Sequence, residues 1–367
     1  MRRPRVLLLT PDFPPAPGGI QVLLHRFATS ASRVTVRVVT RAHAEAQRWD
    51  VASGLDVRRS PRIPGGRRAG LAALNAVGLA HAARFHADVI LCGHIAVAPA
   101  AVLAGRITGT PVVAYLYADE APAQPQLARM AFRSAKATIA LSRYGRDLAI
   151  QLRAPSARVV IIEPGVDPPL LPRAERSDEP LIVTVARLTD RYKGHDVVLD
   201  ALPLIRERVP AARWIVIGDG PLRPELEARA ESLGVSGAVC FTGSVSDMER
   251  DAWLDRARVF VMPSRLPPGG AGGEGYGIVF LEAGAHGLPV VAGAVAGALD
   301  AVIDGETGLL VAPHDARAVA DAVTGLLLDP DRARRLGDAG ARRAAEFSWP
   351  RMAARVEDVL LEAIGRS

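Results

Sequence analysis

Cysteine is scarce in this 367-residue chain, and its two copies exclude a disulfide scaffold and a clustered zinc site. Cys92 and Cys240 lie in separate apolar segments, so we interpret both as small buried hydrophobic residues. No run approaches the roughly 18 uncharged apolar residues of a membrane-spanning helix. The N-terminus, Met-Arg-Arg-Pro, leads into a strand-like segment and not into a signal peptide. We therefore expect a cytoplasmic protein.

Lysine is the second scarce residue. Only Lys136 and Lys193 occur among 45 basic residues, and every other cation is arginine. A lysine that remains in a loop therefore raises the question of whether a compact ammonium charge is needed there. Lys193 lies in such a loop. The net charge of +6 fits nucleic acid, an anionic membrane surface or phosphorylated small molecules, and does not choose among them.

Two nucleotide-binding patterns are also missing. The first strand-like segment leads into the loop TPDFPPAPGG, which contains Gly18 and Gly19 but no G-x-G-x-x-G or G-x-x-x-x-G-K-[ST] pattern. The sequence therefore disfavours a dehydrogenase and a P-loop nucleotide hydrolase.

What is present is an alternation of short apolar segments with helical patterns. The expected strands are 5–10, 34–39, 88–92, 111–116, 137–141, 158–162, 181–186, 213–217, 238–242, 259–262 and 289–292. Near-continuous apolar strands between helices predict parallel sheets covered on both faces. The predicted fold class is α/β, with two doubly wound parallel-sheet domains.

Residues 163–180, EPGVDPPLLPRAERSDEP, interrupt this alternation with prolines and charges. We interpret them as a linker, with domains at 1–170 and 171–349 and a last helix at 350–367. Two open parallel sheets joined in this way form a cleft, and ligands bind beyond the carboxyl ends of such strands. Functional residues are therefore expected where strands end.

Two cations follow the strand 181–186. Arg187 ends the apolar run, and Lys193 comes six residues later, before a helical pattern. Arginine can hold two oxygens at once and lysine supplies a compact charge, so the pair suits a diphosphate. A solvated loop with surface ion pairs is the alternative. The Gly218-Asp219-Gly220 sequence after the next strand is weaker evidence, because a tight strand-to-helix turn explains it equally well.

The stretch GGEGYGIVFLE, residues 272–282, places two glutamates around a glycine turn. Gly277 lets the backbone turn sharply before a helix that starts at Ile278, and such a helix start suits a phosphate. Glu282 then lies about one turn inside the helix and Glu274 in the loop ahead of it, so both can face one ligand. Glutamate near a helix start also complements the helix dipole, and spacing alone leaves both interpretations open.

These segments together resemble the retaining family-4 glycosyltransferases of GT-B fold, over nearly the whole chain. The likeness is greatest to the bacterial phosphatidylinositol mannosyltransferase group. The segments that carry it are DFPPAPGGIQ, EPGVD, VARLTDRYKGHDVVLDAL, IGDGPLRPELE, FTGSVSDMERDAWL, VFVMPSR and EGYGIVFLEAGAHGLPVVAG.

The resemblance implies a role for each strand-end residue. Arg187 and Lys193 would bind the diphosphate of a nucleotide-sugar donor and stabilise the charge on the leaving nucleotide. Glu282 would hold the ribose hydroxyls, and Glu274 the hydroxyls of the transferred sugar.

Backbone groups complete the implied donor site. The amides around Gly277, Ile278 and Val279 would meet the phosphates, and Gly18 and Gly19 would close on the diphosphate from the first domain. No cofactor and no metal are expected, because cations and helix ends neutralise the diphosphate. The first domain would bind the acceptor, the second would bind the donor, and the last helix would return to the first domain.

One departure concerns a histidine that many relatives carry after the strand 111–116, near the transferred sugar. This chain reads YLYADE there, with Tyr117, Asp119 and Glu120. His94, at the end of another strand, is a candidate to line the site instead, and a structural role is its alternative. These four residues are the candidate sugar or acceptor contacts.

The expected function is retaining transfer of a hexosyl group, with mannose favoured, from a GDP- or UDP-hexose to a hydroxyl of a lipid or small-molecule acceptor. A sugar-nucleotide epimerase and a non-catalytic sugar-nucleotide binder are the alternatives. No nucleic-acid partner is expected. The segment 62–86 combines arginines with an apolar helical pattern, which predicts peripheral association with the inner membrane surface or an ordinary surface helix.

Overall fold

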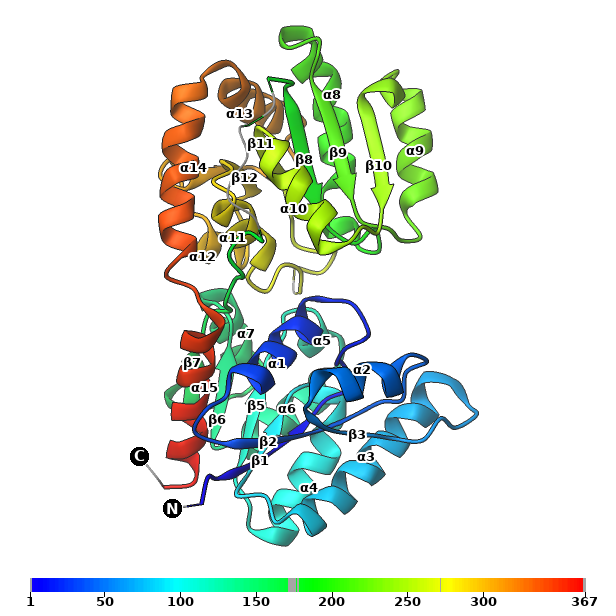
Figure 1. Cartoon of the computed structure of the whole chain (residues 1–367), viewed down its shortest axis with the longest axis vertical. Coiled ribbons are helices and arrows are strands. Elements are labelled where there is room, and N and C mark those ends of the chain that lie inside the picture. Colours follow the sequence, from blue (N-terminus) through cyan, green and yellow to red (C-terminus); the bar gives the residue numbers. More distant parts are fainter. Residues whose placement is uncertain (1, 171–175, 177, 271, 366–367) are drawn as a thin grey trace. The chain divides into compact units, whose positions relative to one another are not determined.

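The computed structural model describes residues 2–170, 176, 178–270 and 272–365 (Figure 1). The chain forms two compact units. The first consists of Met1–Gly165 with Trp349–Ser367, and the second of Val166–Ser348. The sequence placed the domain boundaries a few residues later, after 170 and 349. Part of the predicted linker, residues 171–175 and 177, lies outside the described residues.

The first unit contains a seven-stranded parallel sheet in the order β3-β2-β1-β4-β5-β6-β7. Its strands are β1 (Arg5–Leu9), β2 (Thr35–Thr40), β3 (Asp56–Arg59), β4 (Val89–Cys92), β5 (Val112–Tyr115), β6 (Ala137–Ala140) and β7 (Val159–Ile161). Its helices are α1 (Gly19–Ser30), α2 (Ala46–Ser53), α3 (Gly66–Phe85), α4 (Ala98–Thr108), α5 (Glu120–Ala123), α6 (Pro125–Ser134), α7 (Arg143–Gln151) and α15 (Trp349–Ala363).

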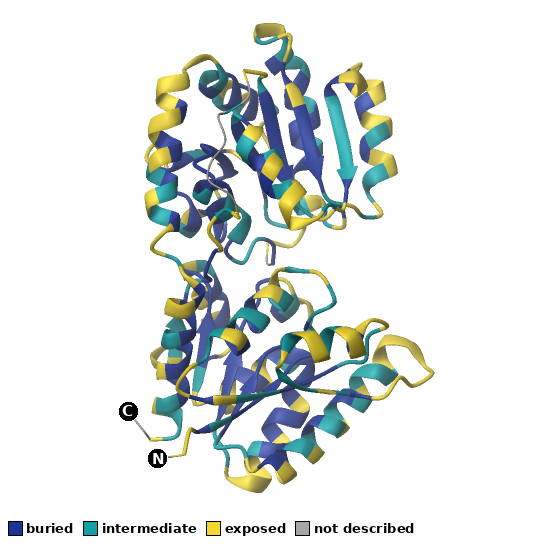
Figure 2. Ribbon diagram, viewed as in Figure 1, coloured by how far each residue is buried: buried dark blue, intermediate teal, exposed yellow. Residues whose placement is uncertain are grey.

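Strand β1 shows why these segments have continuous apolar runs. Leu7 and Leu9 belong to the core formed with α3, α4 and α6. Leu8, between them, lies beside Gly93 together with Leu24 of α1. Successive side chains of a strand point to opposite faces, so a sheet covered on both sides needs apolar residues at every position. The central strands are accordingly buried, and the exposed residues lie mainly on helices and loops (Figure 2).

The last helix, α15, belongs to the first unit and packs against α1. The carboxylate of Glu357 is almost fully buried and accepts hydrogen bonds from the backbone N–H groups of Ser32, Arg33 and Val34, at 2.9, 2.6 and 3.1 Å. These contacts fix α15 to the chain just before β2. The predicted return of the last helix to the first domain is confirmed.

The second unit contains a six-stranded parallel sheet in the order β10-β9-β8-β11-β12-β13. Its strands are β8 (Leu181–Val185), β9 (Arg213–Ile217), β10 (Val239–Gly243), β11 (Val259–Met262), β12 (Val290–Gly293) and β13 (Gly308–Val311). Its helices are α8 (His195–Arg208), α9 (Arg223–Ser232), α10 (Asp247–Arg256), α11 (Ile278–Ala285), α12 (Ala298–Ala301), α13 (Ala316–Leu328) and α14 (Pro330–Ala344).

Two strands escaped the sequence analysis, and both lie at a sheet edge. β3 has the sequence DVRR and pairs only with β2, and β13 pairs only with β12. β3 is largely polar, and β13 (GLLV) stands in a turn-rich segment between Gly305 and Pro313, so neither gave a clear strand signal. The edge strands β7 and β10 were predicted, because their segments are apolar. The predicted two-domain α/β architecture is otherwise confirmed.

In both sheets the strand order reverses at the first strand of the unit. β1 lies between β2 and β4, and β8 lies between β9 and β11. The loops after β1 and β4, and those after β8 and β11, therefore leave their sheet in opposite directions. Such a switch point at the carboxyl ends of the strands is the usual place for a ligand.

Candidate functional site

Lys193 and Glu274 meet at the carboxyl edge of the second sheet. Lys193 lies in the short turn before α8, and Glu274 lies in the loop before α11. The Lys193 Nζ is 2.6 Å from the Glu274 Oε2, and their side chains are 14% and 12% exposed. Because neither charge is well solvated, each depends on the other for compensation. The structure thus brings together two residues that the sequence placed in one site.

The turn that carries Lys193 is held by the loop after β11. Arg265 donates two hydrogen bonds to the carboxylate of Asp196, at 2.8 and 2.7 Å. Its backbone N–H also donates to the carbonyl of Tyr192, at 2.8 Å. Gly194 has a φ of 80°, and a Cβ placed on it would lie 2.4 Å from the carbonyl oxygen of Pro263. The position of the Lys193 ammonium is therefore set by backbone packing and a bidentate ion pair.

Gly277 shapes the start of α11. Its φ is 88°, and a Cβ placed on it would lie 2.4 Å from the ring of Phe280. Since glycine offers no capping side chain, the first amides of the helix, those of Ile278 and Val279, remain available to an anion. The N–H of Gly297 donates to the carbonyl of Glu274, at 3.0 Å, and fixes the loop ahead of the helix.

Glu282 lies in the second turn of α11 and is partly buried. Burial raises the pKa of its carboxyl group, and the charge of Arg250 opposes this rise. Arg250 itself is held by Asp247 and Asp251, both at 2.9 Å. A carboxylate kept in such a place costs stability unless a ligand uses it. That Glu274 and Glu282 face one ligand stays a prediction.

Arg187 is the least constrained of the predicted donor-site residues. Its side chain is 61% exposed, and its guanidinium lies 3.9 Å from the carboxylate of Asp190. A diphosphate-binding role for Arg187 stays a prediction. The nearby glycines have a structural explanation: a Cβ on Gly218 or Gly220 would lie 2.1 or 2.4 Å from the carbonyl of Ala186 or Leu188. These glycines allow the loops after β8 and β9 to approach closely.

In the first unit, His94 lies at the carboxyl end of β4 and is 2% exposed. Its Nδ1 accepts a hydrogen bond from the N–H of Ala96 at 3.0 Å, so the proton of the neutral ring is on Nε2. Nε2 lies 3.5 Å from the Asp12 carboxylate and 3.9 Å from that of Glu120. Burial lowers the pKa of His94, and Asp12 acts in the opposite direction. The segments that follow β1, β4 and β5 thus meet at the imidazole of His94.

The tyrosines of YLYADE border the same cluster. The ring of Tyr117 is centred 6.5 Å from that of His94 and stacks on Tyr115 at 5.8 Å. The Tyr117 hydroxyl is buried and has no hydrogen-bond partner within the described part of the chain. Glu120 opens α5, and Asp119, just before it, is exposed. The structure therefore gathers His94, Tyr117 and Glu120, and leaves Asp119 at the surface.

Gly18 and Gly19 begin α1 in the first unit. Gly18 is the N-cap, with a φ of 144°, and Gly19 is exposed with open space where a Cβ would stand. The Gln21 side chain in the first turn donates to the Asp12 carboxylate at 3.2 Å. The glycine pair therefore lies beside the His94 cluster, and its closing on a donor stays a prediction.

The matches to known protein families cover almost the full chain. A model described as Glycosyltransferase Family 4 matches residues 17–169, and one described as Glycosyl transferases group 1 matches residues 172–343. The GDP-mannose-dependent alpha-(1-6)-phosphatidylinositol monomannoside mannosyltransferase of Mycobacterium tuberculosis (strain H37Rv) is 35% identical, over 97% of this chain and 98% of its own length. The chain belongs to the family-4 glycosyltransferases.

Other relatives agree with this assignment. The protein of the same description from Mycolicibacterium smegmatis is 33% identical to this glycosyltransferase, over 97% of this chain and 98% of that one. Two solved structures share the fold at 22% identity. HepE of Anabaena in complex with UDP and glucose has a TM-score of 0.82, covering 98% of this chain and 99% of its own. Sucrose-phosphate synthase of Thermosynechococcus elongatus also has a TM-score of 0.82, covering 100% of both chains.

The sequence analysis of this glycosyltransferase missed several residues that build the site. Asp12 stands in the quoted segment DFPPAPGGIQ and Arg265 in VFVMPSR, so each lay beside a recognised motif. Their partners, His94 and Asp196, are more than sixty residues away, and only folding brings them together. His286, Asp255 and Asp251 also form a cluster, with His286 Nδ1 2.7 Å from Asp255. Asp251 and His286 stand in the quoted segments FTGSVSDMERDAWL and EGYGIVFLEAGAHGLPVVAG, but nothing in the sequence indicated their contact.

Two features are absent from the described residues. No group of three or more His, Cys, Asp or Glu side chains among them is arranged to hold a metal ion. No helix formed by them is long and apolar enough to cross a membrane.

Proposed function

We propose that this glycosyltransferase moves a mannosyl group from GDP-mannose to an acceptor hydroxyl, with retention of the anomeric configuration. The observation that carries the proposal is the Lys193–Glu274 contact of 2.6 Å beside the start of α11. A cation, a carboxylate and helix-end amides lie together there, which are the groups that a nucleotide-sugar donor needs. The names of the full-length relatives specify GDP-mannose and support this donor over a UDP-hexose.

The second unit would act on the leaving group. Departure of the nucleotide places negative charge on a diphosphate, and fixed cations and amide dipoles stabilise that charge best when they are already in place. Lys193 and the amides of Ile278 and Val279 would receive the phosphates, and Arg187 would join them from its exposed position. The Lys193 ammonium group would then leave the Glu274 carboxylate and bind a phosphate oxygen.

The two glutamates would recognise the rest of the donor. Glu274, released from Lys193, would accept hydrogen bonds from sugar hydroxyls, and Glu282 would accept them from the ribose. We assign neither as a nucleophile, because attack by the acceptor on the face that the nucleotide leaves needs no covalent intermediate on the protein. The acceptor would attack on the same face that the nucleotide leaves. The cations and amides would neutralise the diphosphate without a metal ion.

The first unit would bind the acceptor. His94, Tyr117 and Glu120 offer an imidazole, a phenol and a carboxylate at one sheet edge, which suits a polyhydroxylated molecule. The relatives' names make phosphatidylinositol monomannoside the first acceptor to test. Arg67 and Arg68 are exposed in the first turn of α3, which would favour an anionic lipid surface.

The test is transfer by purified Lys193→Ala and Glu274→Ala variants, with GDP-mannose and phosphatidylinositol monomannoside. We expect each to lose transfer by roughly 10²-fold or more, since a preorganised charge contact is removed. Glu231→Ala, an exposed residue of α9, is the matched control and should retain activity.

Glu274→Gln keeps the shape of the side chain. If its melting temperature matches that of the wild type, a loss of transfer reports on recognition of the donor and not on folding. Turnover near the wild-type level in all three site variants would contradict the assignment. Conversion of the donor without any acceptor would favour the epimerase instead.

A further inference from the structure

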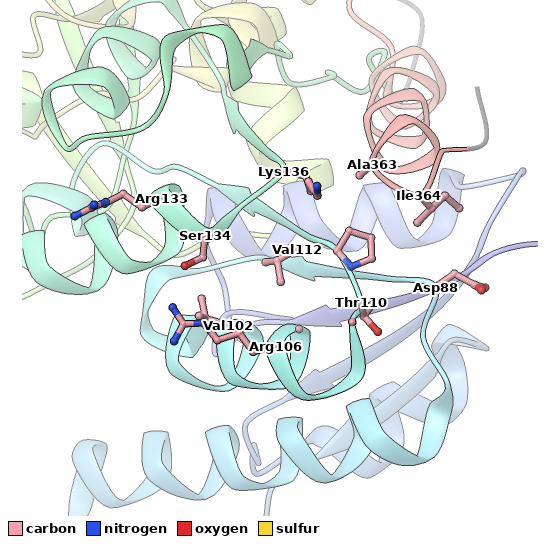
Figure 3. A pocket seen from close by; sticks show the side chains of 13 residues that line it. Asp88, Val102, Arg106, Thr110, Val112, Arg133, Ser134, Lys136, Ala363 and Ile364 are labelled. Carbon is pink, nitrogen blue, oxygen red and sulfur yellow. The ribbon is translucent and has the colours of Figure 1, made fainter.

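The two ends of the first sheet differ in how their polar side chains are placed. At the amino ends of the strands, a pocket of about 710 Å³ is lined by Arg106, Arg133 and Lys136, all of which are exposed (Figure 3). At the carboxyl ends, His94 and Tyr117 are only 2% and 7% exposed. Water satisfies exposed charges, whereas buried polar groups need partners. The groups that a ligand would complete therefore lie at the carboxyl ends.

His94 is fixed as a hydrogen-bond donor. Its Nδ1 accepts from the N–H of Ala96 at 3.0 Å, so the neutral ring carries its proton on Nε2. Burial lowers the pKa of His94, which favours this neutral form. Nε2 lies 3.5 Å from a carboxylate oxygen of Asp12 and 3.9 Å from one of Glu120. With one nitrogen occupied and the other protonated, the imidazole has no lone pair left to take a proton from a substrate.

Asp12 is held by its neighbours and remains accessible. Its backbone N–H donates to the Thr10 hydroxyl at 3.0 Å, and that hydroxyl donates to the Asp12 carbonyl at 3.1 Å. Gln21 Nε2 donates to Oδ1 of Asp12 at 3.2 Å, and His94 faces Oδ2. The Asp12 side chain is nevertheless 21% exposed, and each carboxylate oxygen can accept more than one hydrogen bond. Asp12 is therefore oriented and still able to bind a ligand.

The phenol of Tyr117 is a second observation that points to a ligand. Its hydroxyl is buried and has no hydrogen-bond partner among the residues that the structure describes. Its ring is centred 6.5 Å from that of His94. Burial raises the pKa of Tyr117, and nearby groups that include Glu120 and Asp12 add to the rise, so the phenol lies in the field of both carboxylates. A phenol can donate and accept, and a hydroxyl group of a ligand would satisfy it.

The charges of this cluster select what it can bind. Ionised carboxylates accept hydrogen bonds and donate none, and they repel a phosphate. Asp12 and Glu120 both lie within 3.9 Å of one nitrogen, so they border the same small region. Neighbouring hydroxyl groups of one ring can donate a hydrogen bond to each of them. The cluster therefore suits a neutral polyol ring and not an anion.

We propose that Asp12 binds a hydroxyl group of the acceptor, and that His94 is a positioning residue that acts through Asp12. A neighbouring hydroxyl of the same sugar or cyclitol ring donates to Glu120, and the Tyr117 hydroxyl completes the contact. The inference rests on the proposed function, because it specifies how the first unit holds the acceptor. The His94–Asp12 contact of 3.5 Å is longer than an ordinary hydrogen bond, and such contacts tighten when a substrate binds.

Two substitutions of His94 separate its contact with Asp12 from its contact with Ala96. Asparagine can accept from the Ala96 N–H and is a good N-cap, but it is too short to reach Asp12. Glutamine has the opposite property, because its amide nitrogen reaches the place of Nε2. We expect His94→Asn to lower kcat/KM for phosphatidylinositol monomannoside by roughly 10–100-fold, and His94→Gln to retain about ten times more than His94→Asn. The opposite order would show that His94 only caps residues 95–97, and would overturn its positioning role.

A double variant tests whether His94 acts through Asp12. Asp12→Asn should lower the same kcat/KM by roughly 10–100-fold, with an unchanged affinity for GDP-mannose. Adding His94→Asn to Asp12→Asn should change kcat/KM by less than about twofold, because the contact is already lost. Asp147→Asn, an exposed residue of α7, is the matched control and should keep wild-type activity. Losses that multiply in the double variant, or a fully active Asp12→Asn protein, overturn the proposal.

Binding of simple rings tests the site without transfer. myo-Inositol and methyl α-mannoside should give saturation-transfer NMR signals with the wild type, and these should weaken in Asp12→Asn. The fully O-methylated rings have no hydroxyl donors and should give no signal. Absence of a signal from both free rings, or equal signals from the methylated rings, overturns the proposal. Ring binding that depends on Asp12, in a protein that transfers nothing from GDP-mannose, would reject the proposed function and leave the polyol site standing.

Discussion

The two units share a parallel-sheet architecture and use its carboxyl edge in different ways. In the second unit, Lys193 and Glu274 form an ion pair of 2.6 Å within a loop that glycines and Arg265 hold in place. In the first, a buried His94 with a lowered pKa lies between two carboxylates. The carboxyl edge of the second unit therefore offers fixed charges, which suit a diphosphate. The carboxyl edge of the first unit offers groups that can titrate and form hydrogen bonds, which suit hydroxyl groups.

The largest effect that sharpens this comparison is expected from His94→Asn. Transfer should fall by roughly 10–100-fold, because the imidazole lies between the polar groups of the proposed acceptor site. GDP-mannose affinity, measured by calorimetry, should stay within about twofold, or about 0.4 kcal/mol, because the side chains proposed to bind the donor belong to the second unit. Lys193→Ala should instead weaken donor binding. An equal decrease of donor affinity in both variants would break the distinction between the two edges.

Acid should destabilise the second unit through His195, which follows Lys193. Burial, aided by the charge of Lys193, lowers the pKa of His195 to about 4. The unfolded chain therefore binds the proton first, and stability is lost as the pH falls below the ordinary histidine pKa near 6.5. The loss amounts to about 2 kcal/mol between pH 7 and pH 5.

Urea denaturation of wild type and His195→Gln at both pH values measures this contribution. The variant should lose less stability over the same interval. An identical loss in the variant would show that other groups, His94 included, account for the acid sensitivity.

Glu282→Gln should separate stability from function in the second unit. Burial raises the pKa of Glu282, so the folded state binds its proton more tightly and its contribution to stability declines as the pH rises through that pKa. At pH values above 7, the neutral glutamine should therefore raise the melting temperature of the protein. Donor affinity should fall by about tenfold, because a charged acceptor is lost. A lower midpoint with unchanged affinity would contradict both expectations.

The smallest effect on stability is expected from Gly19→Ala in the first unit. Space is open where its Cβ would stand, so the unfolding free energy should change by less than about 0.5 kcal/mol. Gly277→Ala is the contrasting variant, because its φ of 88° and the ring of Phe280 oppose a side chain. Transfer that is lost in a fully stable Gly19→Ala protein would indicate that a ligand approaches this backbone. Unchanged transfer would remove Gly19 from the proposed donor site.

The sequence predicted the strands that carry apolar runs, including the edge strands β7 and β10. It missed β3, whose sequence DVRR is polar, and β13, which stands in a turn-rich segment. It found Lys193, Glu274 and His94 because each follows a strand. It missed Asp12 and Arg265, whose importance depends on partners distant in the sequence.

The amino-acid sequence by itself determined the α/β architecture, the family and the strand ends where functional groups lie. Hydrophobic periodicity and the order of the motifs can be read directly from the sequence, because neither depends on contacts between distant residues. Tertiary structure alone decided which charges are paired, which are buried and which are left unmatched. It paired Lys193 with Glu274 and placed His94 between carboxylates. These outcomes depend on contacts between residues far apart in the chain, and a linear pattern does not encode the distance between them.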